Sequence, residues 1–336
     1  MMHIIETGPG MPDFHLFTEL PRAIYPADSL RFKSSEAISI EFLKGCYVLL
    51  DDSKPVARAS VYDNPLLEYA GKHAFSVGHY ECVERDEYAA QLLTQVTSTV
   101  QSWGGEYLIG PMNGSTWESY RFLSGHENPL FFTEPCHHLY YNTQFVNAGF
   151  EPIAHYYSNI DRGMEPAHPE IVARAEELTA LGMTIRPIDL ADFEAEIERI
   201  FEFNTLAFKT NFLYTPISKE AFVKKYAQTK AYINPDLTLL AEDAAGNLIG
   251  YFFCIHDFFN TVNKSLIVKT LARHPAPEWR GLGHVIGNVI YRKAVELGYT
   301  SAIHSFIYEH GTSKKLSTNF SGSNYRNYVL YGKPIS

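Results

Sequence analysis

The sequence predicts an α/β protein with a mixed sheet (α+β), in which one unit of strands and helices occurs twice. The chain has 336 residues, more than the ~250–300 at which single hydrophobic cores stop growing. The order strand, strand, strand, helix, strand appears in both halves. Hydrophobic residues make up 46% of the chain and charged residues 20%, which supports packed cores. No sequence identity at a fixed period accompanies this order, so the duplication rests on element order alone.

The first half begins this unit with a hairpin. Two apolar segments, 46–50 and 55–62, flank the turn sequence DDSK and predict paired strands. A third strand is expected over 74–83, and a helix over 84–103, where apolar or small residues recur at helical spacing. Glycines end that helix, and a short strand follows within 104–111.

A domain boundary is predicted between the two units. Residues 161–182 start with Gly and Pro and continue as a charged helical segment, which is typical of a connection. We therefore divide the chain into a first lobe (1–163), a linker helix (164–182) and a second lobe (183–336). The elements expected in the second lobe are strand 184–188, helices 190–208 and 218–229, a hairpin of 237–243 with 248–256, strand 265–273, helix 284–298 and strand 300–308.

Composition excludes several classes of partner. The net charge is −10 and no run of Lys and Arg could neutralise a row of phosphates, so nucleic acid is not expected as a partner. The most apolar stretch, 248–259, is too short to span a bilayer, and the N-terminus lacks the pattern of a secretion signal. We expect a cytoplasmic protein without a membrane segment, as a monomer or homodimer. The 22 Tyr and 22 Phe indicate either aromatic-rich cores or an aromatic-lined substrate cleft.

Neither metal nor hydrolase chemistry is signalled. The four cysteines are far apart without a C-x-x-C pair. Cys136, His137 and His138 are consecutive, and consecutive residues of an extended segment rarely close one metal shell, so we expect a loop and no metal. Ser115 and Thr116 lack a G-x-S-x-G context, and either one is expected to cap a helix that begins at Trp117.

The stretch EWRGLGHVIG, residues 278–287, carries the clearest chemical signal. It lies between a predicted strand and a predicted helix, where free backbone N–H groups and the helix dipole favour an anion. Arg280 would add a charge-assisted contact. A phosphate or pyrophosphate is therefore expected. Two alternatives are a dinucleotide-binding loop, which too few following residues disfavour, and a glycine-rich helix start that binds nothing.

The second lobe resembles the GCN5-related N-acetyltransferases. Their acyl-CoA motif is a strand, then Arg-x-x-Gly-x-(Gly or Ala), then a helix. Here Pro275, Arg280, Gly281 and Gly283 fit it, and Val285 stands where Gly or Ala is usual. The match covers about 237–332 at motif strength. The first lobe resembles, more weakly, the companion lobe of two-lobed members, so the resemblance implies tandem GNAT-like acyl-CoA N-acyltransferase domains.

The resemblance implies a place for acetyl-CoA or coenzyme A, as co-substrate. Its pyrophosphate would lie on the loop amides, with Arg280 beside it, and its pantetheine arm would pair with the preceding strand. A substrate amine would attack the thioester directly, between strands that part to admit it. The residues implied in cofactor binding are Leu271, Ala272, Arg273, Arg280, Gly281, Leu282, Gly283, His284, Val285, His310 and Ser313.

The helix after the next strand departs from the family pattern. Members often read Asn-x-x-Ala-x-x-Leu-Tyr there, the Tyr protonating the leaving thiolate, whereas this chain has His310, Ser313, Leu316 and Ser317 at those positions. Three explanations are open: another group donates the proton, the thiolate leaves unassisted, or the protein does not catalyse. A thiol pKa near 8.5 makes the thiolate a tolerable leaving group, and Tyr308 could substitute as the acid.

Two functions follow as expectations. The first is acyl transfer, most simply of acetyl, to a primary amine of a small molecule or peptide, for which His256, Asp257, Glu309 and His310 at predicted strand ends are candidate bases. The second is a non-catalytic acyl-CoA-binding protein. In the first lobe VERDEYA (83–89) occupies the place of the glycine loop, and its acidic residues would repel a pyrophosphate.

Overall fold

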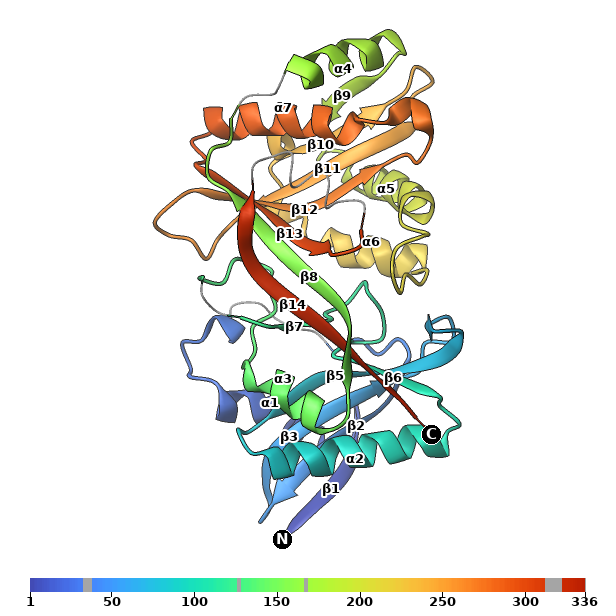
Figure 1. Cartoon of the computed structure of the whole chain (residues 1–336), viewed down its shortest axis with the longest axis vertical. Helices are drawn as coiled ribbons and strands as arrows, with labels where there is room; N and C mark the ends of the chain where they lie inside the picture. Colours follow the sequence, from blue (N-terminus) through green and yellow to red (C-terminus); the bar gives the residue numbers. More distant parts are fainter. Residues whose placement is uncertain (33–37, 126–127, 166–168, 312–321, 336) are drawn as a thin grey trace.

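One mixed sheet runs through the whole molecule. The computed structural model describes residues 1–32, 38–125, 128–165, 169–311 and 322–335. The strands follow the order β1-β2-β3-β5-β6-β14-β8-β13-β12-β11-β10-β9. Figure 1 shows the first half of the chain at one end of the molecule and the second half at the other, with β8 and β14 crossing between them.

The first half contains the predicted unit. The predicted hairpin is β2 and β3, the next strand is β5, and helix α2 leads to the short strand β6. The bounds are β1 (Met2–Thr7), α1 (Phe14–Ile24), β2 (Leu43–Asp51), β3 (Lys54–Tyr62), β4 (Glu68–Tyr69), β5 (Lys72–Cys82), α2 (Asp86–Ser102), β6 (Tyr107–Gly110), β7 (Phe122–Leu123), α3 (Tyr140–Asn147) and β8 (Glu151–Asp161).

The second half repeats the order, and each predicted element lies within a few residues of its expected bounds. Two helices follow its first strand instead of one. The bounds are α4 (Pro169–Ala180), β9 (Thr184–Pro187), α5 (Phe193–Ala207), α6 (Lys219–Ala227), β10 (Thr238–Glu242), β11 (Leu248–His256), β12 (Ser265–Arg273), α7 (Leu282–Glu296), β13 (Ser301–Tyr308) and β14 (Ser323–Pro334).

The halves exchange their last strands. β8, which ends the first half, pairs antiparallel with β13 of the second half. β14, which ends the second half, pairs antiparallel with β6 of the first, and β8 and β14 pair with each other. The predicted boundary at 163 falls just after β8, yet the strand before it completes the sheet of the other half.

Helices cover the sheet on both faces. In the second half, α7 packs on one face through Leu282, Val285 and Ile286, and α5 and α6 cover the other. The segment expected as a linker contains α4, which packs against α7 with Leu178 in the same core. By its contacts α4 is therefore part of the second half.

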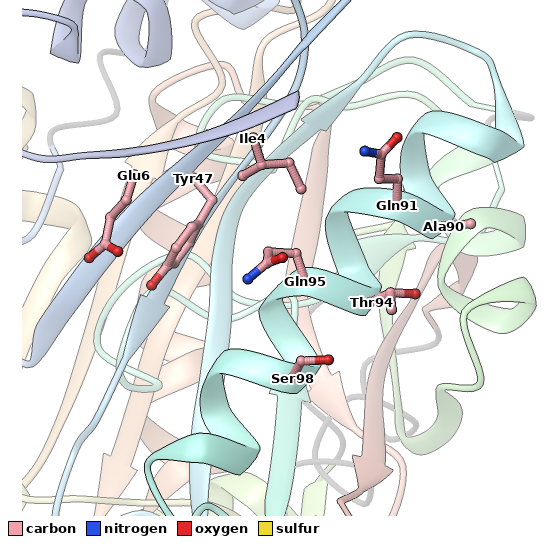
Figure 2. Close-up of a pocket in the computed structure, with 8 residues that line it drawn as sticks. All are labelled: Ile4, Glu6, Tyr47, Ala90, Gln91, Thr94, Gln95 and Ser98. Atoms are coloured by element: carbon pink, nitrogen blue, oxygen red, sulfur yellow. The ribbon is translucent and has the colours of Figure 1, made fainter. Parts of the chain in front are cut away.

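A surface groove marks a difference between the halves. It lies between strands β1 and β2 and helix α2 and has a volume of about 620 Å³. In the second half, α4 packs on the corresponding helix, α7. Figure 2 shows the residues that line the groove of the first half: Ile4, Glu6, Tyr47, Ala90, Gln91, Thr94, Gln95 and Ser98.

Candidate functional site

The central strands of the second half part from each other. β12 and β13 pair in parallel only from Ser265 with Ser301 to Val268 with His304. Beyond this point β12 continues beside β11 as far as Arg273, while β13 leans toward β8, where the Phe306 amide donates to Ser158 Oγ at 3.1 Å. We call the region between 269–273 and 305–308 the fork. The edge of β12 that holds Leu271, Ala272 and Arg273 has no pairing with β13.

A loop with free amides follows β12 directly. Gly281 adopts φ +89°, a left-handed conformation that favours glycine, and α7 starts at Leu282. The amides of His284 and Val285 donate back to the Gly281 carbonyl, at 3.0 and 3.2 Å. Within the described residues, the amides of Gly281, Leu282 and Gly283 donate to no other group. The free donors are thus the first three of the five predicted positions.

The electrostatics of this loop favour an anion. The first turn of α7 contains no acidic residue, and the side chain of Arg280 is exposed beside it. Burial lowers the pKa of His284, which keeps that ring neutral near pH 7. The positive contribution therefore comes from the helix dipole and from Arg280.

Arg174 of α4 fixes this loop from behind. Its Nε donates to the carbonyl of Arg280 at 2.8 Å, and its Nη2 donates to the carbonyl of Glu278 at 2.6 Å. A Cβ on Gly281 would lie 3.1 Å from Arg174 Cγ. These contacts orient the carbonyls of Glu278 and Arg280 toward α4. Sequence reasoning missed Arg174, because no local pattern links residues 106 positions apart.

Three of the predicted polar residues lie together at the end of β13. The Tyr308 ring stacks on Phe212, with centroids 5.1 Å apart. Burial raises the pKa of Tyr308, and Glu309 adds to the rise. The Glu309 amide donates to the His155 carbonyl at 3.0 Å, and the exposed His310 contacts the Tyr308 ring.

The other predicted polar residues do not join them. His256 pairs with Leu266, at the end of β12 opposite the loop, and its ring contacts Phe258 and Tyr299. The prediction that His256 faces the cleft is therefore wrong. Ser313, Leu316 and Ser317 lie outside the described residues.

The fork also holds two cations that the sequence analysis did not single out. Lys269 follows Val268, the last residue of β12 that pairs with β13. Burial lowers the pKa of its ammonium to about 8, and the charges of Arg121 and Lys225 add to the decrease. Arg121 lies over Tyr120, Tyr156 and Phe306, with Cζ 3.9, 4.7 and 4.4 Å from the ring centroids.

In the first half the corresponding strands, β5 and β6, do not open. They pair from Ala74 with Tyr107 to Ser76 with Ile109, and the Met112 amide then donates to the Val77 carbonyl at 2.8 Å. The chain after β6 therefore stays against β5.

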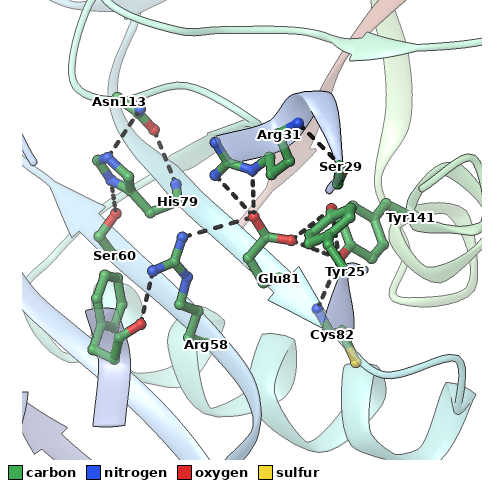
Figure 3. Close-up of polar contacts among 11 residues, drawn as sticks. Tyr25, Ser29, Arg31, Arg58, Ser60, His79, Glu81, Cys82, Asn113 and Tyr141 are labelled. Carbon is green, nitrogen blue, oxygen red and sulfur yellow. Dashed lines mark hydrogen bonds and ion pairs between the residues drawn. The ribbon is translucent and has the colours of Figure 1, made fainter. Parts of the chain in front are cut away.

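The side chain of Asn113 completes this closure. Its Oδ1 accepts the His79 amide at 2.9 Å, and its Nδ2 lies 3.2 Å from His79 Nε2. A Cβ on Gly78 would lie 2.2 Å from Asn113 Oδ1, so only glycine fits there. Figure 3 shows the contacts between Asn113 and His79.

A satisfied polar cluster fills the space further along β5. Glu81 is 2% exposed and accepts hydrogen bonds from Tyr25 and Tyr141, at 2.8 and 2.7 Å. Arg31 donates to it at 3.0 Å, and Arg58 lies 3.7 Å away. Both oxygens of this carboxylate therefore accept hydrogen bonds, and two arginines lie beside it.

The turn from β5 to α2 contains the acidic sequence noted above. β5 ends at Cys82 and α2 begins at Asp86, with Asp86 and Glu87 in its first turn. These carboxylates occupy the helix start where α7 has none.

The constellations that were set aside have structural roles. His137 Nε2 accepts the Leu123 amide at 2.6 Å, and the His138 ring stacks on Tyr25. The helix expected at Trp117 is wrong: the segment forms a turn in which Ser115 Oγ accepts the Trp117 amide. Among the described residues, no cluster of three or more metal-ligating side chains occurs. In that same part of the chain, no helix is long and apolar enough to cross a bilayer.

Comparisons with known proteins identify the fold. No family model and no curated protein matches the sequence. A GCN5-related N-acetyltransferase from Sphaerobacter thermophilus matches with a TM-score of 0.54 and 14% identity over 99% of this chain and 96% of its own. A tandem GNAT protein from the clavulanic acid biosynthesis pathway matches with a TM-score of 0.53 and 10% identity over 100% and 99%.

A third solved structure agrees with these two. A probable N-acyltransferase from Enterococcus faecalis has a TM-score of 0.60 and 9% identity over 100% of this chain and 73% of its own. At these identities the likeness establishes the fold alone. The predicted tandem arrangement of GCN5-related N-acetyltransferase folds is confirmed.

Proposed function

We propose that the protein is an acyl-CoA-dependent N-acyltransferase. Its second half would bind acyl-CoA, most simply acetyl-CoA, and transfer the acyl group to a primary amine of a small molecule or peptide. One observation carries the proposal: three amides at the start of α7, which have no partner among the described residues, lie in the loop after a strand that parts from its parallel neighbour.

The residues present fit coenzyme A. The amides of Gly281, Leu282 and Gly283 would hold the pyrophosphate, because free N–H groups at a helix N-terminus favour phosphates. Arg280 would contribute a charge-assisted contact. The unpaired edge at 271–273 offers main-chain groups to the amide-containing pantetheine arm, in the way that a strand edge receives another strand.

Bound acyl-CoA supplies a thioester as the acyl donor. The lone pair of a neutral amine forms the N–C bond, the C–S bond breaks, and the proton lost by the amine is balanced by the proton gained at sulfur. We assign the proton donor to Tyr308, because it ends β13, one arm of the fork, and a phenol is protonated at neutral pH. Glu309, the adjacent carboxylate, is the proposed acceptor of the amine proton.

A second candidate function is binding of acyl-CoA without catalysis. It is favoured by the sequence, because Ser317 stands where related enzymes have the acidic tyrosine. Both functions require that the loop binds coenzyme A, so a wild-type protein that does not bind coenzyme A would contradict both.

One experiment separates them. The protein is incubated with acetyl-CoA and a broad panel of primary amines, free thiol is followed with a chromogenic disulfide, and coenzyme A binding is measured by calorimetry. Acyl transfer predicts amine-dependent thiol release. Binding with no release across the panel contradicts transfer and supports the second function.

A further inference from the structure

Two cations lie over one aromatic ring at the fork. The Arg121 Cζ is 4.4 Å and the Lys269 Nζ is 5.2 Å from the centroid of the Phe306 ring. Lys269 belongs to β12 and Phe306 to β13, so the ammonium and the ring come from the two arms of the fork. Arg121 comes from the first half of the chain, which makes this point a junction of both halves.

The two cations have no counter-charge among the residues that the structure describes. Within the described ranges, neither Arg121 nor Lys269 forms an ion pair with a carboxylate, and Arg121 Nη1 is buried with no hydrogen-bond partner. The guanidinium makes one bond, from Nε to the Tyr120 carbonyl at 3.0 Å. The neighbouring cation Lys225 is paired with Glu118 at 2.8 Å. Like charges at this depth are unfavourable unless an anion joins them.

The backbone at this point is held in an uncommon conformation. Arg121 has φ +76° and Phe306 has φ +58°. Both values lie in the left-handed region, which residues other than glycine and asparagine rarely adopt. Strain of this kind persists where the surrounding structure imposes it and is concentrated at functional sites. The backbone conformations that position this cation and this ring therefore both carry an energetic cost.

The pyrophosphate is not the anion that this site fits. Lys269 lies four residues before Arg273 along β12, or ~13 Å before the loop begins. The anion must therefore belong to the part of the reaction that meets the fork itself. Since an amine enters there, the simplest source is an acidic group on the same molecule.

We infer that the acceptor is a primary amine that also carries a carboxylate, such as an amino acid. Arg121 and Lys269 bind its carboxylate, and both cations contact the Phe306 ring. This inference rests on the proposed function, because an acceptor enters the fork only if acyl-CoA lies along β12. A polyamine would meet two like charges, so the fork selects against it.

Matched pairs of acceptors test the inference. Each amino acid of a panel is compared with its amino alcohol, which keeps the amine and side chain but lacks the carboxylate. Binding to the protein saturated with coenzyme A is measured by calorimetry, and kcat/KM with acetyl-CoA by thiol release. We expect the carboxylate member to be favoured about ten- to hundredfold, as for a charge-assisted hydrogen bond.

Substitutions locate the preference. Arg121→Gln and Lys269→Met are each expected to remove most of it while changing the Kd for coenzyme A less than about twofold, which is within the usual reach of remote effects. Lys264→Met is the matched control, because Lys264 also lies over a ring, Tyr299 at 4.6 Å, near the other end of β12. If Arg121→Gln lowers the melting temperature sharply, the Lys269 variant decides.

The outcomes separate this inference from the proposed function. Equal or better use of the amino alcohols would overturn the inference and leave N-acyl transfer standing. Binding of coenzyme A with no thiol release from any acceptor would overturn transfer, and the calorimetric comparison would still decide whether the fork selects a carboxylate. A preference for succinyl-CoA over acetyl-CoA that Arg121→Gln abolishes would place the carboxylate on the acyl group, against the inference.

Discussion

The two halves of the molecule build the same strand junction and finish it differently. In the first half, Met112 and Asn113 occupy the hydrogen-bonding edge of β5, at Val77 and His79. In the second half, β13 turns toward β8 after His304, and the edge of β12 beyond Val268 has no partner in β13. The same topology is thus closed in one half by its own chain and open in the other.

The first turns of helices α2 and α7 also differ, and the difference again favours ligand binding in the second half. α2 begins with Asp86 and Glu87, whereas α7 begins after Gly281 with no acid in its first turn. The comparison teaches that a shared fold does not carry a shared site, because a few side chains decide which edge and which helix terminus can receive a ligand.

The largest expected effect comes from making the open half resemble the closed one. Gly283→Asp places a carboxylate among the free amides of α7, and coenzyme A affinity should fall by more than about a hundredfold, as for an uncompensated charge against a phosphate. Calorimetry measures the affinity. Arg85→Asp, at the start of α2, is the mirror control and should leave it unchanged.

Because Gly283 is buried, the melting temperature of this variant must be compared with that of the wild type. Arg280→Glu changes an exposed side chain and provides a second test without that risk. Full affinity in both folded variants would contradict the loop assignment.

The next effect tests the chemistry of the open half. Tyr308→Phe removes the proposed proton donor and keeps the ring that stacks on Phe212, so kcat should fall about a hundredfold, as for loss of a general acid. The Kd of coenzyme A should not move. An unchanged kcat would exclude Tyr308 as the donor and would favour unassisted departure of the thiolate.

One substitution tests what holds the first half closed. Asn113→Ala leaves the buried His79 amide without its acceptor, which should lower the free energy of unfolding by about 1–3 kcal/mol. Chemical denaturation measures this value. Asn147→Ala, at an exposed asparagine bonded to Asp86, is the control and should change it by less than about 0.5 kcal/mol. An equal effect in both variants would show that Asn113 does not hold the closure.

A smaller effect is expected from the support of the loop. Arg174→Met removes the donors to the carbonyls of Glu278 and Arg280, and coenzyme A affinity should weaken about five- to tenfold, equivalent to ~1 kcal/mol. Glu177→Gln alters only the outer partner of Arg174 and should have little effect. Equal losses in the two variants would assign the effect to the surface ion pair.

The smallest effect concerns pH. The pKa of the Lys269 ammonium is 10.5 when free and about 8 in the folded protein. Below pH 8 the ammonium is charged in both states, so the protein carries the full loss of folding stability that the buried charge causes. Between pH 8 and 10.5 this loss disappears, because the ammonium of the folded state deprotonates first. Lys269→Met should therefore raise the melting temperature at pH 7 by a few degrees, ~1–3 °C per kcal/mol. The gain should shrink toward pH 10.5. A gain independent of pH would refute this reasoning.

Local patterns predicted the repeated unit and the loop. In the first half β2, β3, β5, α2 and β6, and in the second half the elements from β9 to β13, follow hydrophobic spacing and turn residues. The loop at 280–283 follows from Arg and Gly between a strand and a helix. Strands β4, β7 and β8 and helix α3 were not predicted. The exchange of β8 and β14 was not predicted, because the partners of those strands lie in the other half of the chain.

The residues of the candidate site outside the loop were not predicted, for the same reason. Arg174, Arg121 and Asn113 gain their roles from neighbours that only the folded chain brings close. Trp117 illustrates the opposite error, since its indole donates to the Thr215 carbonyl at 2.8 Å and a turn replaces the helix that capping residues predicted.

The number of coenzyme A molecules bound per chain tests the comparison most directly. A calorimetric titration of the wild type with coenzyme A should give a stoichiometry of one, and Gly283→Asp should remove the transition while Arg85→Asp retains it. A stoichiometry of two, or a single site that survives Gly283→Asp and is lost in Arg85→Asp, would contradict the account of one open and one closed half.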